Sequence, residues 1–262
     1  MKSGQFFRFR EENPLLGSQE WIWESLGNRA VPNSKWVSSV LDCNQKIVNK
    51  TFEEIFSEPE IDFEEEIYGL LKLTQKTYYA QFPAPIELYT FVRLTNPEFV
   101  LESGVSSGIS SSHILMALHR NKKGTLYSID FPVRQKSKKR ERGSLPWMLP
   151  FDKSSGWAVP PKLKKRWKLL IGKSEKVIPK LLSSLPRVDL FCHDSPASAM
   201  HLDFELKHVK GHLKAGSVVV ADNTDMNSVA FHNTASSVGA RIFYKGHSKS
   251  LAAFRVPSNN FL

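Results

Sequence analysis

Three residues in the first half of the chain, Glu102, Gly104 and Gly108, have the types and spacing of a ligand-binding turn. They follow an apolar strand that begins at Val100 and precede a helix predicted over residues 110–119. Glycine adopts positive φ angles and lets a ligand approach the backbone closely. A strand, an acid, a loop with two glycines and a helix together predict a nucleotide-binding turn.

The spacing of this turn, E-x-G-x-x-x-G, indicates which ligand it suits. A dinucleotide-binding turn reads G-x-G-x-x-G, because a pyrophosphate rests on the helix N-terminus between close-set glycines. Here the carboxylate of Glu102 would repel a pyrophosphate, so a cationic ligand fits better. An ordinary strand-to-helix turn is the alternative interpretation, since so short a motif also occurs by chance.

A second predicted strand, Thr125–Asp130, also ends in an acid. An acid at this point can accept hydrogen bonds from both hydroxyls of a ribose. The alternative is that Asp130 is a turn residue at the start of the loop that contains Pro132. Two strands ending in acids favour an adenosyl ligand.

The chain beyond these strands continues to alternate between strand and helix patterns. Strands alternating with helices form a parallel sheet with right-handed crossovers. We therefore expect an α/β fold: a doubly wound, Rossmann-like, seven-stranded sheet that is parallel apart from a final antiparallel strand, flanked by helices. The further predicted elements are strands at 167–172, 188–193 and 217–221, helices at 174–182, 199–213 and 227–238, and a closing hairpin of strands at 241–244 and 251–256.

These segments resemble class I S-adenosylmethionine-dependent methyltransferases, whose cofactor carries a sulfonium and an ammonium group and no phosphate. A broad, mostly uncharacterised methyltransferase family with the same core is also similar, at residues 154–160 and 193–195. The resemblance covers roughly residues 85–256. The segments similar to catechol and caffeoyl-CoA O-methyltransferases are Gly172–Leu181, Asp194, Leu213–Gly216 and Ala221–Asn223.

The resemblance implies an enzyme that transfers a methyl group from S-adenosylmethionine to an oxygen of a small molecule or glycan. Glu102 and the two glycines would hold the methionine end of the cofactor. Asp130 would bind the ribose, and Lys173, Ser174 and Glu175 would lie along the adenine edge. Ser174 also starts a predicted helix, so an N-cap is its alternative role. The cofactor-binding residues that the resemblance implies are Glu102, Gly104, Ser106, Gly108, Asp130, Phe131, Lys173, Ser174 and Asp194.

Asp194, Asp222 and Asn223 follow two strands whose carboxyl ends would meet at the edge of the sheet where ligands bind. Two carboxylates and an amide oxygen suit Mg²⁺, which would lower the pKa of an acceptor hydroxyl. Asp194 is then the expected catalytic residue as well as a metal ligand. The alternative is that the two acids bond to nearby loop amides and that Asn223 is a turn residue.

One position departs from the pattern of both families. Catechol-type enzymes carry a general-base lysine three residues after the first metal aspartate, and the broader family often has a histidine there; this chain has Ala197. Deprotonation must therefore come from the metal, from another residue such as His193 or His201, or not at all. An adenosyl-binding protein without transfer activity is one alternative function.

Positive charge is concentrated in one part of the chain. Residues 131–180 contain 15 Lys and Arg and three acids, a net charge of +12, whereas the whole chain has +10. Most of this charge lies in a predicted insertion, residues 132–166, which would recruit an anionic acceptor or nucleic acid if it is not simply a solvated loop. A nucleic-acid methyltransferase is thus a second function class. Against it, no Asn/Asp-Pro-Pro-aromatic motif follows the strand that ends at His193, and Cys192 lies inside that strand.

Residues 1–84 are predicted to form a mostly helical N-terminal extension or cap, and residues 85–262 the cofactor-binding domain. One acidic helix is predicted over residues 52–79, with Ile67 and Leu70 on its packed face. In this superfamily such extensions commonly cover the substrate pocket; a packing or dimerisation element is the alternative, so a homo-oligomer stays open.

Composition limits the remaining possibilities. A chain of 262 residues with 41% hydrophobic content can bury one substantial core. No apolar run approaches the roughly 20 residues that span a bilayer, and the N-terminus lacks the apolar core of a secretory signal. The two cysteines, Cys43 and Cys192, suggest no disulfide framework and no thiolate metal site. We therefore expect a cytoplasmic protein without a membrane partner.

Overall fold

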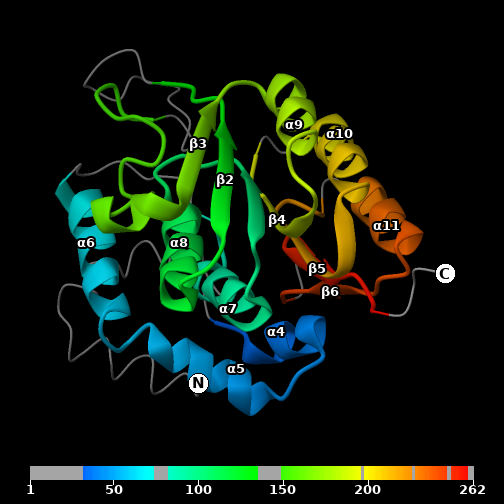
Figure 1. Cartoon of the computed structure of the whole chain (residues 1–262), viewed down its shortest axis with the longest axis horizontal. Helices are drawn as coiled ribbons and strands as arrows, with labels where there is room; N and C mark the ends of the chain where they lie inside the picture. Colours follow the sequence, from blue (N-terminus) through cyan, green and yellow to red (C-terminus); the bar gives the residue numbers. More distant parts are fainter. Residues whose placement is uncertain are drawn as a thin grey trace.

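A computed structural model describes residues 32–73, 82–134, 149–195, 198–225, 228–246 and 249–258. Its strands form one seven-stranded sheet in the order β3-β2-β1-β4-β5-β7-β6 (Figure 1). Strands β1 to β5 are parallel to one another, and β7 runs antiparallel to both β5 and β6. The strands are β1 Phe99–Ser103, β2 Thr125–Asp130, β3 Trp167–Ile171, β4 Val188–His193, β5 Leu213–Ala221, β6 Ile242–Tyr244 and β7 Ala252–Arg255.

Helices cover both faces of this sheet, as Figure 1 shows. None of those in the described part of the chain is long and apolar enough to cross a membrane. The helices are α4 Ser34–Leu41, α5 Gln45–Glu54, α6 Glu60–Leu73, α7 Pro85–Thr95, α8 Ile109–Asn121, the 3₁₀ helix η2 Pro161–Arg166, α9 Ser174–Leu182, α10 Ala199–Lys210 and α11 Ser228–Ser237.

Each face of the sheet has its own apolar core, because side chains along a strand alternate between the two faces. In β1, Val100 joins the core formed with α4, α5, α7 and α8, whereas Leu101 joins the core formed with α9, α10 and α11. The same alternation sends Glu102 toward α8 and Ser103 toward α10. Neighbouring residues of one strand therefore belong to two different polar environments.

The predicted fold class is confirmed: the sheet is Rossmann-like, with β7 as its antiparallel strand. Strands β2 and β4 and helix α9 have the predicted bounds. The predicted end of helix α10 at Leu213 is wrong, because α10 ends at Lys210 and Leu213 begins β5, paired with Val188. The predicted start of this strand at Ser217 is wrong as well, because β5 begins at Leu213 and contains Gly216 with φ +85°.

The single helix predicted over residues 52–79 is also wrong. Helix α5 ends at Glu54 and α6 begins at Glu60. Pro59 between them has no backbone N–H and cannot continue a helix from the preceding turn. Within α6 the predicted packed face is found, with Ile67 fully buried and Leu70 against the core. Residues 74–79 of the prediction lie outside the described residues.

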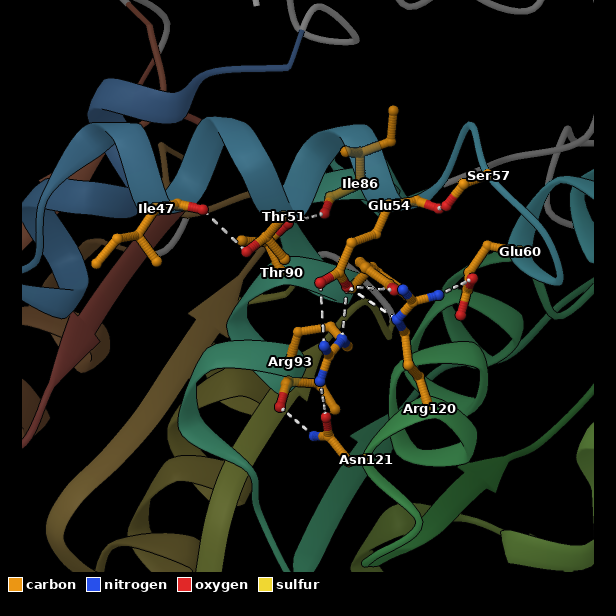
Figure 2. A network of polar contacts seen from close by, with 12 residues as sticks. Ile47, Thr51, Glu54, Ser57, Glu60, Ile86, Thr90, Arg93, Arg120 and Asn121 are labelled. Atoms are coloured by element: carbon orange, nitrogen blue, oxygen red, sulfur yellow. Dashed lines mark hydrogen bonds and ion pairs between the residues drawn. The ribbon is translucent and has the colours of Figure 1, made fainter.

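Polar contacts tie α5 and α6 to α7 and α8 (Figure 2). The Glu54 carboxylate accepts hydrogen bonds from Arg93 Nε at 2.7 Å and from the Tyr89 hydroxyl at 2.9 Å. Arg120 of α8 forms ion pairs with both Glu54 and Glu60. These side chains join the helices before residue 84 to helices beside the first strand.

Candidate active site

The carboxyl edge of the sheet contains the strand order reversal at which doubly wound sheets bind ligands. The reversal lies at β1, whose neighbours are β2 on one side and β4 on the other. Glu102 lies near the end of β1 and Asp130 is the last residue of β2. The charge of Asp130 contributes to raising the pKa of Glu102, so the two acids lie close together, as expected from the sequence.

Glu102 is completely buried, and both oxygens of its carboxylate are occupied. It accepts hydrogen bonds at 2.6 Å from the hydroxyls of Ser110, Ser111 and Ser128. Burial raises the pKa of Glu102 to about 6, against the lowering effect of the three serines. Glu102 therefore holds the start of α8 and strand β2 around the loop of residues 104–108.

Both glycines of this loop have positive φ angles, +91° at Gly104 and +97° at Gly108. A Cβ on Gly104 would lie 2.0 Å from the carbonyl oxygen of Asp194, and one on Gly108 would lie 2.6 Å from Cγ2 of Val159. Glycine is thus required at both positions, as the motif predicts. The atoms that approach so closely belong to other segments of the chain rather than to a ligand.

Residues 155–159, which we call the strap, lie against the glycine loop. Gly156 N–H donates to the Ser106 carbonyl at 2.8 Å, and Ala158 N–H donates to the Ser107 carbonyl at 2.9 Å. The Ser155 hydroxyl donates to the Asp130 carboxylate. Burial raises the pKa of Asp130 although this hydroxyl and nearby backbone N–H groups favour its charged form. The predicted ribose ligand is therefore also the residue that fastens the strap.

Phe131, which follows Asp130 directly in the chain, lies beside Lys173. The Lys173 ammonium lies 5.5 Å from the centre of the Phe131 ring, which is 58% exposed. The alternative role predicted for Ser174 is wrong: Lys173 occupies the N-cap position of α9, without a side-chain capping bond, and Ser174 is the first helical residue. The Ser174 hydroxyl instead lies 3.2 Å from Nε2 of His201.

The three predicted metal ligands directly follow β4 and β5, which are neighbouring strands. His193 pairs with Ala221, and Asp222 N–H donates to the His193 carbonyl at 3.0 Å, so Asp194 and Asp222 follow neighbouring strands. Asn223 has φ +58° and donates from its amide nitrogen to Asp222 Oδ2 at 3.3 Å. Two adjacent carboxylates and an amide are suited to a hard cation by ligand type. Within the described residues, no group of three or more His, Cys, Asp or Glu side chains is arranged to hold a metal.

Burial raises the pKa of the Cys192 thiol well above its usual value, and the charges of Glu102, Asp194 and Asp222 raise it further. Cys192 pairs with Glu102 of β1 and with Val220 of β5, so the acids at the ends of these strands lie in one neighbourhood. This placement also agrees with the expectation that Cys192 is buried in a strand rather than presented as a nucleophile.

One buried acid of this region, Glu205 in α10, was not anticipated from the sequence. Its carboxylate accepts hydrogen bonds from Ser103 at 2.6 Å and from Nδ1 of His193 at 2.8 Å, and it lies 3.0 Å from Nε2 of His201. The His201 side chain is only 15% exposed. The spacing of His201 and Glu205, one turn of a helix apart, is the signal that would have indicated the pair. Ala197 lies outside the described residues.

Comparisons with known proteins agree with this geometry. Residues 101–224 match a family described as "Methyltransferase domain". The fold resembles an O-methyltransferase from Bacillus cereus in complex with SAH, with TM-score 0.52, 12% identity and coverage of 80% of this chain and 97% of that one. It also resembles CalS11, a TDP-rhamnose 3'-O-methyltransferase of calicheamicin biosynthesis, with TM-score 0.50, 14% identity and coverage of 80% and 94%. A search of curated proteins finds no match.

The sheet order and the acids at its carboxyl edge define the class I methyltransferase fold. The matched segment runs from β1 to the loop after β5 and contains Glu102, Asp130, Asp194 and Asp222, so the part of the chain that carries these acids is similar to a methyltransferase domain.

Proposed function

We propose that this enzyme transfers the methyl group of S-adenosylmethionine to an oxygen atom of a small molecule or glycan. The observation that carries the proposal is the placement of Glu102, Asp130, Asp194 and Asp222 at the carboxyl ends of four neighbouring parallel strands. Such negative charge favours the sulfonium and ammonium groups of the cofactor. Oxygen as the acceptor atom is supported by the names of the two solved structures, both O-methyltransferases, one of which acts on a sugar nucleotide.

In this proposal Asp130 binds the ribose, and Phe131 with Lys173 and Ser174 lies along the adenine. The cradle for the methionine end is formed by Gly104, Ser106 and Gly108 with the carboxylate of Glu102 below them. Asp194, next to Gly104, contributes to the cofactor site and to the acceptor site. The enzyme brings the acceptor oxygen into line with the methyl group, and this alignment supplies much of the rate enhancement.

A divalent cation such as Mg²⁺ is part of the proposal. Asp194, Asp222 and Asn223 would hold it, and when bound it would lower the pKa of an acceptor hydroxyl. This would remove the need for a strong protein base near Ala197. If methyl transfer to an oxygen acceptor is unchanged by excess chelator, the metal is not required.

The proposal is tested by isothermal titration of S-adenosylhomocysteine into the unaltered chain and the Asp130→Ala variant. We expect micromolar or tighter binding to the unaltered chain and none to the variant, because the variant lacks the acceptor for the ribose hydroxyls. Unchanged affinity in Asp130→Ala would refute the ribose assignment. Absence of binding to the unaltered chain would refute the proposed function.

Ser155→Ala is the matched control, because Asp130 also fastens the strap. This variant removes the strap's hydroxyl and leaves the carboxylate in place. We expect it to bind S-adenosylhomocysteine at least as tightly as the unaltered chain, since one competing donor for Asp130 is gone. Equal loss in both variants would indicate that Asp130 acts by holding the strap and not by binding the ribose.

A second candidate acceptor is nucleic acid, favoured by the basic surface near η2. Lys162, Lys164 and Lys165 are exposed there, and Arg166 donates to the Gly124 carbonyl, next to the exposed Lys122 and Lys123. Such a surface attracts phosphates in a salt-dependent manner. A gel shift that is absent even at low salt would exclude this acceptor class.

A further inference from the structure

Glu205 connects three segments of the carboxyl edge through one carboxylate. Its oxygens accept hydrogen bonds from Ser103, the last residue of β1, and from His193 and Ser195 at the end of β4. Through His201 it also reaches the start of α9. Each of these segments contributes a residue to the proposed cofactor site.

The Glu205 carboxylate is ionised in this setting. Burial alone would raise its pKa, but the hydrogen bonds from His193 and His201 outweigh burial and hold the pKa far below its usual value. An ionised carboxylate only accepts hydrogen bonds. Every nitrogen or hydroxyl that faces Glu205 must therefore present a hydrogen to it.

This requirement fixes the hydrogen on His201. Nε2 of His201 lies 3.0 Å from Glu205 Oε1, so Nε2 carries the hydrogen. The same nitrogen lies 3.2 Å from the Ser174 hydroxyl oxygen. An N–H cannot accept, so Ser174 is an acceptor in this contact and its own hydrogen points elsewhere. Among the described residues, Glu175 also faces His201, 3.6 Å from Nδ1, and it favours a hydrogen on that nitrogen too.

The Ser174 hydroxyl accepts from His201, so its own hydrogen is available for donation to another group. Ser174 is 5% exposed, and His201 is the hydrogen-bond partner of its side chain in the described part of the chain. A buried hydroxyl whose hydrogen is unused favours a ligand with an acceptor at that position. Adenine offers three unsubstituted ring nitrogens in the plane of the base besides its amino group, which donates.

We propose that His201 and Glu205 are positioning residues that orient Ser174 as a hydrogen-bond donor to a ring nitrogen of the cofactor's adenine. This inference rests on the proposed function, because it takes S-adenosylmethionine as the ligand. It adds a reason for the recognition of adenine: two residues of α10 determine that the hydroxyl at the start of α9 donates a hydrogen bond to the ligand.

The test measures binding of S-adenosylhomocysteine and of three analogues in which ring nitrogen 1, 3 or 7 is replaced by CH. We expect one analogue to bind the unaltered chain about three- to tenfold more weakly than S-adenosylhomocysteine, the range of one net hydrogen bond. In Ser174→Ala this discrimination disappears, because no donor is left. A role in packing alone would not distinguish nitrogen from CH.

Variants of His201 test the positioning role. His201→Gln keeps an N–H donor near the place of Nε2, so we expect the discrimination to persist. His201→Met has a similar volume and no N–H. We therefore expect the ratio of the affinities for S-adenosylhomocysteine and for the weakest-binding analogue to fall toward one. Glu205→Gln should lower it as well, because an amide no longer requires a hydrogen on Nε2. If Glu205→Gln does not fold, the two His201 variants still decide the question.

Several results would overturn the inference. Equal discrimination in the unaltered chain and Ser174→Ala would show that Ser174 is not the donor. Equal discrimination in His201→Gln and His201→Met would show that His201 does not orient it. Absence of S-adenosylhomocysteine binding to the unaltered chain would instead refute the proposed function, and with it this inference.

Discussion

Single residues of the carboxyl edge serve the fold and the proposed site together. Glu102 holds three serines around the glycine loop, and Asp130 fastens the strap. Gly104 and Gly108 give room to Asp194 and Val159. Each of these residues thus has contacts within the protein itself. A substitution at any of them is expected to change stability as well as ligand binding.

Gly104→Ala tests the packing of the loop at this scale. We expect a loss of about 2 to 5 kcal/mol in the free energy of unfolding, from the positive φ and from a Cβ placed 2.0 Å from the Asp194 carbonyl oxygen. Denaturant unfolding measures the loss. Gly211→Ala is the control, because φ is −64° there and a Cβ would meet nothing within 4 Å. It should leave stability within about 1 kcal/mol; similar losses in both variants would contradict the described loop packing.

The sequence predicted which acids gather, but not what surrounds them. The strand ends bring Glu102, Asp130, Asp194 and Asp222 together because parallel strands share a carboxyl edge. The contact of Gly108 with Val159 depends on the path of the long connection from β2 to β3, which local periodicity does not encode. Glu205 was missed because its partners come from β1 and β4, which only the folded sheet brings to α10.

At the scale of elements, the helices before residue 84 are built into the core. Trp36 of α4 and Phe52 of α5 belong to the same apolar cluster as Phe91 of α7 and Leu115 of α8. The Glu54 network adds polar contacts between these helices. The sequence predicted helical structure here but joined α5 and α6, since the acidic apolar pattern continues across Pro59.

Glu54→Ala should lower the free energy of unfolding by about 1 to 3 kcal/mol at neutral pH, because Arg93, Arg120 and Tyr89 lose a half-buried acceptor. Hydrogen bonds from Arg93 and Tyr89 outweigh burial and lower the pKa of Glu54 below 4.5. Its contribution is therefore present above pH 4.5 and is lost as the pH falls through the lower folded value. Urea unfolding at several pH values measures both effects.

Glu53→Ala is the matched control for this prediction, because Glu53 is exposed on the same helix. It should change stability by no more than about 0.5 kcal/mol. A Glu54→Ala variant as stable as Glu53→Ala at neutral pH would show that the network does not stabilise the packing of α5 on α7 and α8.

At the scale of the whole molecule, the fold class was the most predictable property. Alternating strand and helix patterns predict a parallel, doubly wound sheet, and the final hairpin predicts its antiparallel end. The predicted bounds were wrong where strand pairing in the folded sheet decides them, as at the start of β5, where Leu213 pairs with Val188. The reversal of strand order at β1 then determines where a ligand is expected, whatever the acceptor is.

The most direct test of the account is a crystal structure of the chain with S-adenosylhomocysteine. We predict the ribose hydroxyls within hydrogen-bond distance of the Asp130 carboxylate, about 2.6 to 3.2 Å, and the adenine against Phe131 with a ring nitrogen near the Ser174 hydroxyl. The Ser155 hydroxyl would then have released at least one oxygen of Asp130. A ligand bound away from the carboxyl ends of β1 and β2 would contradict the assignment of the site.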